Sequence, residues 1–126
     1  MTYIWRSGLP LVVRKSRFLG KITEVNSLLQ ARDVLLSLKK QNLNATHYIS
    51  VSRIKVGQSS YLEEASDNGE PPAASRLMTI VKRHNIYNVL LVVLRWYGGK
   101  PLGPARFRAI DEAAESAIKE YLSSKP

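Results

Sequence analysis

The fold of this chain is decided by the stretch NVLLVVLRWYGGKPLGPARFR, residues 88–108. Its residues 89–94 are six consecutive apolar side chains, and such an unbroken run indicates a strand that is buried on both faces. Three glycines and two prolines follow within 98–104, and a strongly helical sequence comes after them. The stretch therefore predicts a central strand over 88–96, a glycine-rich turn and a helix that starts near Pro104.

The remaining elements are predicted from apolar periodicity and from turn and capping residues. In the first half of the chain, we expect short strands at 11–13 and 17–25, a helix from Ser27 to about 42 and a strand at 47–55. A hairpin turn at 56–60 then leads to a return strand beginning at 61–62 and to a polar loop at 63–72. In the second half, we expect a helix over 73–84, the strand at 88–96 and a last helix at 104–122. This order predicts an α+β fold, in which one sheet carries helices packed on one face. The length of 126 residues predicts a single domain over 1–126.

The composition limits the classes of function. There is no cysteine, which excludes disulfides, zinc–thiolate sites and thiol catalysis. No apolar run is long enough to cross a membrane, and the N-terminus does not resemble a secretion signal, so we expect a cytoplasmic protein without a membrane partner. The net charge of +9 suits a polyanionic partner such as RNA, the ribosome or an acidic protein surface.

The glycine-rich connection has the chemistry of an anion site. A strand end, flexible backbone, a helix N-terminus and cationic side chains together favour a bound anion, and Trp96 and Tyr97 add surfaces on which bases stack. The structural alternative is a tight turn whose arginines are only solvated. We predict a basic groove formed by Arg95, Gly98, Gly99, Lys100, Gly103, Arg106 and Arg108, with His47, Asp67 and Glu70 nearby.

The acidic pair Asp67 and Glu70 has two interpretations. Two carboxylates three residues apart can hold a metal or exchange protons, but both also suit a turn before a helix. His47 is a lone histidine at a strand start, and such residues are more often structural than ligands. Since no catalytic set or cofactor motif accompanies them, we expect a protein that is not an enzyme, with no metal and no cofactor.

Four blocks of sequence resemble the IMPACT family. They are KSRF at 15–18, ATH at 45–47, SDNGEP at 66–71, and RWYGG at 95–99 followed by LGP and RF within 102–107. They occur in the family's order, and the last block looks more like eukaryotic than bacterial members. The chain departs from the family at Pro101, where relatives usually have an aliphatic residue, and at Asn68, where they usually have aspartate. Asn68 thus removes a carboxylate from any metal site.

The resemblance implies a fold like the second domain of a small-subunit ribosomal protein, with a sheet and helices on one side. It also implies a cytosolic protein linked to translation. Eukaryotic relatives restrain the starvation-activated kinase of translation initiation by competing for its activator, and they carry an additional N-terminal domain. Bacterial relatives carry an additional C-terminal domain and have been proposed to bind nucleic acid. We expect neither additional domain in these 126 residues.

Three hypotheses follow for function. The first is a non-enzymatic binding module in the control of translation initiation and amino-acid starvation signalling, which binds RNA, the ribosome or another anionic ligand through the basic groove. The second is a protein–protein docking module of the translation-stress machinery. The third is an enzyme that acts on a phosphorylated small molecule, with Asp67 and Glu70 holding a metal or moving protons.

Overall fold

The sheet is built around the apolar strand that the sequence singled out. In the computed structural model, which describes residues 3–125, β6 (Val89–Trp96) pairs antiparallel with β3 (Ser16–Glu24) on one side and with β4 (His47–Val56) on the other. The sheet has six strands in the order β1-β3-β6-β4-β5, with β2 also paired to β3. The prediction of a central strand over 88–96 is therefore confirmed.

The two edges of the sheet are formed by shorter strands. On one side, β1 (Arg6–Ser7) and β2 (Leu11–Val13) both pair with β3. On the other side, β5 (Ser60–Ser66) forms a hairpin with β4. The return strand thus extends to residue 66, and the prediction of a loop over all of 63–72 is wrong. Polar residues at 63–66 are compatible with a strand because this strand lies at an edge.

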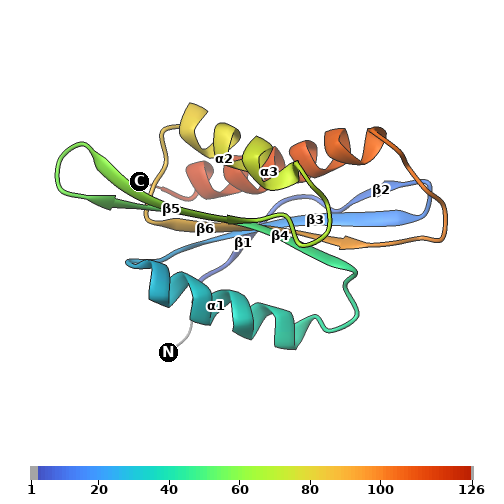
Figure 1. The fold of residues 1–126 in the computed structure, drawn as a ribbon, viewed down its shortest axis with the longest axis horizontal. Coiled ribbons are helices and arrows are strands. Elements are labelled where there is room, and N and C mark those ends of the chain that lie inside the picture. The colour runs from blue at the N-terminus through green and yellow to red at the C-terminus, as the bar shows by residue number, and fades with distance from the viewer. Residues whose placement is uncertain (1–2, 126) are drawn as a thin grey trace.

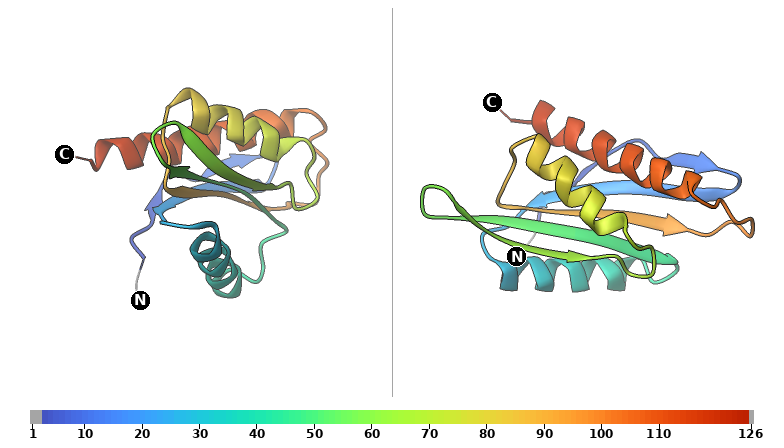
Figure 2. Two further views of the ribbon diagram at one scale, coloured as in Figure 1. Left: turned by 60° about the vertical axis from the view of Figure 1, so that its left-hand side comes forward. Right: turned by 45° about the horizontal axis from the view of Figure 1, so that its top comes forward.

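Helices cover both faces of the sheet, so the prediction of helices on one face is wrong, while the α+β class is confirmed. Figures 1 and 2 show α2 (Ala73–Arg83) and α3 (Ala105–Ser123) on one face and α1 (Leu28–Gln41) on the other. The cause lies in β6, whose alternate residues are apolar on both sides. Leu91 and Val93 join the core under α2 and α3, whereas Leu90 and Val92 join the core over α1.

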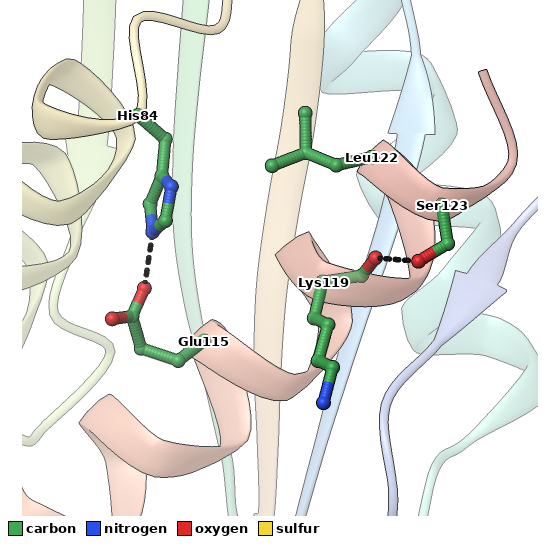
Figure 3. A pocket seen from close by; sticks show the side chains of 5 residues that line it. All are labelled: His84, Glu115, Lys119, Leu122 and Ser123. Carbon is green, nitrogen blue, oxygen red and sulfur yellow. Dashed lines mark hydrogen bonds and ion pairs between the residues drawn. The ribbon is translucent and has the colours of Figure 1, made fainter. Parts of the chain in front are cut away.

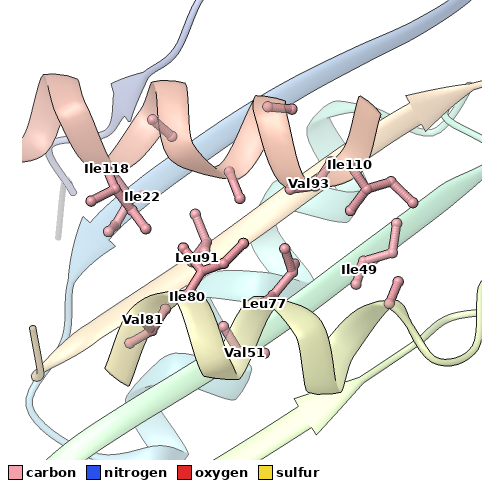
Figure 4. Packing of buried hydrophobic residues seen from close by; sticks show 14 of the residues in the cluster. Ile22, Ile49, Val51, Leu77, Ile80, Val81, Leu91, Val93, Ile110 and Ile118 are labelled. Atoms are coloured by element: carbon pink, nitrogen blue, oxygen red, sulfur yellow. The ribbon is translucent and has the colours of Figure 1, made fainter. Parts of the chain in front are cut away.

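The larger core lies between the sheet and the α2–α3 pair. Figure 4 shows Leu77 of α2 and Ile110 and Ile118 of α3 packed over Ile22 and Leu91 of the sheet. The helix α3 lies directly on β3 at Gly20, where an added Cβ would stand 2.1 Å from the carbonyl oxygen of Ala113. This close contact fixes α3, and with it the loop that carries the predicted site, against the sheet.

The ends of the helices follow the local signals in the sequence. Ser27 caps α1, because its Oγ accepts a hydrogen bond from the backbone N–H of Gln30 at 3.0 Å. The two prolines at 71–72 stand directly before α2, and Pro104 stands directly before α3. These three helix starts agree with the sequence prediction.

Candidate functional site: the basic end of the sheet

Four connections that are distant in sequence meet at one end of the sheet. The C-terminal end of β6 lies beside the start of β4, since Arg95 and His47 are register partners. The β5–α2 loop, the β6–α3 loop and the β2–β3 turn close around this end (Figure 1). The blocks predicted to form a site are therefore neighbours, although 79 residues separate Ser16 from Arg95.

At the centre of this end is a carboxylate held by two arginines, which we call the Arg95–Glu70–Arg106 triad. Arg95 Nη1 donates to Glu70 Oε2 at 2.5 Å, and Arg106 Nε donates to Glu70 Oε1 at 3.1 Å. The side chains of Arg95 and Glu70 are only 5% and 6% exposed, whereas that of Arg106 is 29% exposed. The triad joins β6, the β5–α2 loop and the first turn of α3. Removing one partner from such a buried pair leaves an uncompensated charge.

Arg95 is enclosed by its neighbours. Its guanidinium lies 5.3 Å from the ring centre of Phe18 and 5.6 Å from that of Tyr97, and its Nη2 donates to Ser16 Oγ at 3.4 Å. Among the residues that the structure describes, its Nε has no hydrogen-bond partner. Arg95 thus belongs to the supporting layer of the site and does not face solvent as the groove prediction requires.

The acidic loop is fixed by its own hydrogen bonds. Asp67 Oδ1 accepts from the backbone N–H of Ala74 at 2.7 Å, which satisfies a free donor in the first turn of α2. The side-chain oxygen of Asn68 accepts a hydrogen bond from the backbone N–H of Tyr48, and the backbone carbonyl oxygen of Asn68 lies 2.7 Å from His47 Nδ1. Gly69 has φ +92° and leaves room for the His47 ring. His47 and Asp67 therefore anchor the loop that presents Glu70.

The glycine turn packs against the β2–β3 turn. An added Cβ on Gly98 would stand 2.2 Å from the carbonyl group of Lys15, so these two backbones touch. The N–H of Gly98 also donates to Ser16 Oγ at 3.2 Å. Gly99 and Gly103 have φ values of +90° and +58°, where side chains are rarely tolerated, and both are open to solvent. The turn thus brings two basic segments of the sequence together.

The exposed cations of this end come from both segments. Residues 14–17 and 95–108 contain seven of the 19 Lys and Arg residues and no Asp or Glu. Within residues 3–125, Arg95 and Arg106 form ion pairs with Glu70, whereas the other five cations of these segments have no carboxylate within ion-pair distance. These five exposed residues, here called the basic surface, are Arg14, Lys15, Arg17, Lys100 and Arg108.

Several residues of this end were not predicted as site residues. The hydroxyl of Ser16 contacts both Arg95 and Gly98, and Thr46 Oγ1 accepts from the N–H of Tyr97 at 2.9 Å. Arg17 lies over the Trp96 ring, 4.8 Å from its centre. Ser16, Arg17 and Thr46 all belong to the blocks that resemble the IMPACT family, so that resemblance was the signal that pointed to them.

A surface hollow of about 500 Å³ lies away from this end, between the end of α2 and the second half of α3. Figure 3 shows His84 and Glu115 on its wall, and their side chains lie 2.6 Å apart. Within residues 3–125 there is no group of three or more acidic or histidine side chains placed to hold a metal ion. None of the helices described is long and apolar enough to span a membrane.

Comparison with known proteins identifies the family. The model of the Impact N-terminal domain matches residues 14–118, which include all four sequence blocks. The chain belongs to the Impact N-terminal domain family. Protein IMPACT from Oryctolagus cuniculus is 38% identical over 122 residues, and the match covers 93% of this chain and 38% of that protein. The Protein IMPACT homolog of Saccharomyces cerevisiae is 34% identical over 117 residues, covering 90% of this chain and 45% of the homolog.

Solved structures agree with the family assignment. A crystal structure of a hypothetical protein superimposes with a TM-score of 0.82 over 95% of this chain and 62% of the other, at 20% identity, which supports the fold alone. The structure of the two-domain translational regulator Yih1 gives a TM-score of 0.65 at 33% identity, over 91% of this chain and 46% of Yih1. The chain thus spans less than half the length of Yih1 and of the two curated family relatives above.

Proposed function

We propose that this chain is a non-enzymatic binding module in translational regulation, which acts in the cytoplasm and binds RNA, free or on the ribosome, through the basic surface. The link to translation rests on family membership and on the similarity to a two-domain translational regulator. As the resemblance to the IMPACT family implies, we place this role in the control of translation initiation during amino-acid starvation. The expectation that it is not an enzyme rests on the two acids, since Asp67 caps α2 and Glu70 is engaged by two arginines.

The observation that carries RNA binding is the joining of two acid-free segments. Contact between the backbones of Gly98 and Lys15 brings the segment 14–17 against the start of the segment 98–108. Cations without carboxylate partners attract phosphates and release counterions when they bind them. Tyr97 is 47% exposed and Trp96 is partly exposed beside Arg17, so aromatic rings are available next to these charges. Rings and cations together suit an RNA whose bases are unpaired.

The roles of the predicted site residues are therefore divided in this proposal. Lys100 and Arg108 contact phosphate directly, and Gly98, Gly99 and Gly103 shape the turn that carries them. Arg106 is shared, because it holds Glu70 and is still partly exposed. The remaining predicted residues hold these groups in position from the layer beneath them, namely Arg95, Glu70, Asp67 and His47.

The test is RNA affinity measured by fluorescence anisotropy with a short single-stranded RNA at two salt concentrations. We expect Lys100→Ala/Arg108→Ala to weaken binding and to flatten the salt dependence by about 0.7 per lost phosphate contact. The matched control is Arg6→Ala/Lys119→Ala, which removes one arginine and one lysine away from the basic surface and should leave the salt slope close to wild type. Equal losses in the two variants, or weak binding with no salt dependence, would contradict the proposal.

A further inference from the structure

A row of cationic and apolar side chains lies on the α1 side of β3. Because side chains alternate along a strand, Arg17, Leu19 and Lys21 point to the side opposite Gly20, which lies against α3. Arg17 is exposed, and Leu19 and Lys21 are partly exposed. Within residues 3–125 no helix covers this row. The helix α1 lies on the same face (Figures 1 and 2) but packs over β4, β5 and β6, and none of its Cα atoms comes within 8 Å of a Cα atom of β3.

Each of the two cations in this row is paired with a tryptophan. Arg17 lies 4.8 Å from the ring centre of Trp96, its register partner on β6, and Lys21 lies 5.9 Å from the ring centre of Trp5. The two cations are four residues apart, so the two pairs stand about 13 Å apart along the strand. Both rings pack against the core over α1 and stay partly exposed. These residues, here called the β3 strip, are Trp5, Arg17, Leu19, Lys21 and Trp96.

The charge of the β3 strip is positive and is not neutralised by the surrounding chain. On this side of the sheet, the alternate residues from 17 to 23 of β3 and from 90 to 96 of β6 include no acid. Within residues 3–125, neither Arg17 nor Lys21 has a carboxylate within ion-pair distance. Arg17 also belongs to the basic surface, so the strip continues that surface away from the glycine turn.

The pairing of cations with rings favours a nucleic acid over an acidic protein as the occupant. An acidic peptide would satisfy the two cations alone. A single-stranded nucleic acid also uses the rings, because its unpaired bases stack on aromatic side chains and on the guanidinium plane of arginine. A duplex keeps its bases stacked inside and would offer this strip mainly phosphates and sugars.

We propose that the ligand of the basic surface is single-stranded RNA, which continues along the β3 strip from the glycine turn toward Trp5. In this path Arg17 and Lys21 contact phosphates, and unpaired bases stack beside the two tryptophans. The inference rests on the proposed function, because the strip begins at the basic surface. It adds the class of RNA and the path that the RNA takes across the sheet.

Tryptophan fluorescence tests this path, because both tryptophans of the chain lie in the β3 strip. In a Trp96→Phe variant the remaining emission comes from Trp5, which lies outside the basic surface. A single-stranded RNA of about ten nucleotides should quench this emission over the concentration range in which anisotropy of the labelled RNA reports binding. A base-paired RNA of equal charge, and polyaspartate, should leave the Trp5 emission unchanged.

Two lysine variants in the Trp96→Phe background separate the strip from general charge. Lys21→Ala should weaken the quenching of Trp5 and flatten the salt dependence of RNA binding by about 0.7, the value of one phosphate contact to a single strand. The matched control is Lys55→Ala. Lys55 is also partly exposed and lies 5.0 Å from the ring centre of Tyr87, but it belongs to β4 outside the strip. This control should bind RNA and show quenching like its parent.

The outcomes distinguish this inference from the proposed function. RNA that binds by anisotropy and leaves Trp5 emission unchanged overturns the β3 strip, while the proposed function stands. Quenching of equal size by duplex RNA or by polyaspartate, or equal effects of the two lysine variants, also overturns the strip. Absence of RNA binding by the wild-type protein overturns both.

Discussion

The buried triad and the basic surface use the same residue types for opposite purposes. Arg95, near the C-terminal end of β6, is 5% exposed and bound to Glu70, whereas Lys100 and Arg108, in the segment that follows β6, are exposed and unpaired within residues 3–125. A buried arginine without its carboxylate is costly, and a surface cation without one is not. The comparison teaches that fewer cations are available to bind a ligand than the sequence contains. It also teaches that the buried layer that supports the basic surface is itself made of charged side chains.

The largest difference between the two regions is expected in stability. Arg95→Ala should destabilise the fold by ~3–5 kcal/mol, because Glu70 then stays buried with only the partly exposed Arg106 side chain as a partner. Arg108→Ala, which removes the same side chain from the surface, should change stability by less than about 0.5 kcal/mol. Urea unfolding followed by circular dichroism measures both.

A double variant separates lost charge pairing from lost volume. Arg95→Met/Glu70→Leu replaces the buried pair with apolar side chains, and it should be more stable than Arg95→Ala, since no unpaired buried carboxylate remains. If Arg95→Ala and Arg108→Ala unfold at similar urea concentrations, the triad is not the structural element described above.

The next effect concerns the contact that joins the two basic segments. Gly98→Ala should destabilise the protein by ~1–3 kcal/mol, because its Cβ cannot fit 2.2 Å from the Lys15 carbonyl without displacing backbone. It should also lower RNA affinity, since the segment 14–17 is pushed away from the glycine turn. Gly99→Ala is the control: it meets no atom within 4 Å and carries only the strain of its φ of +90°. RNA affinity and urea unfolding of both variants provide the readout, and a Gly99→Ala variant that loses more affinity would contradict this account.

The smallest effect is expected far from both regions, at the exposed pair of Arg32 and Glu64. The hydrogen bond from Arg32 holds the pKa of the Glu64 carboxyl below its ordinary value of 4.5. A lowered folded-state pKa gives stability that is present above pH 4.5 and is lost as the pH falls through that folded pKa. Wild type should therefore exceed Glu64→Gln slightly in urea midpoint at pH 7, and the difference should shrink as the pH falls below 4.5. A carboxyl NMR titration of wild type and Arg32→Gln checks the pKa itself.

Much of the fold follows from local signals in the sequence. The run 89–94 predicts the doubly buried central strand, and Ser27 with Gln30 predicts the start of α1. The side of the sheet that each helix covers was not predictable, because an amphipathic helix fits either apolar face of β6. The length of β5 was hidden because Glu63 and Glu64 look like loop residues, while the structure pairs them with Arg53, Lys82 and Arg32.

The sequence predicted that the segments of the candidate site lie together, but it did not predict which of their side chains are buried. The glycine turn, its cations and the acidic loop are neighbours, as the sequence led us to expect. The burial of Arg95 could not be foreseen, since its partner Glu70 lies 25 residues earlier in the chain and only the tertiary fold brings them together. Lys15 was likewise missed as a site residue, because its nearness to Gly98 depends on strand pairing between β3 and β6.

The central claim is that the exposed cations around the glycine turn bind RNA while the triad behind them only supports the turn. The most direct test is an NMR titration of the ¹⁵N-labelled protein with a short single-stranded RNA. The account predicts that the largest amide shifts fall on residues 14–17, 97–100 and 106–108. Shifts concentrated at the hollow between α2 and α3, or spread evenly over all lysines and arginines, would contradict it.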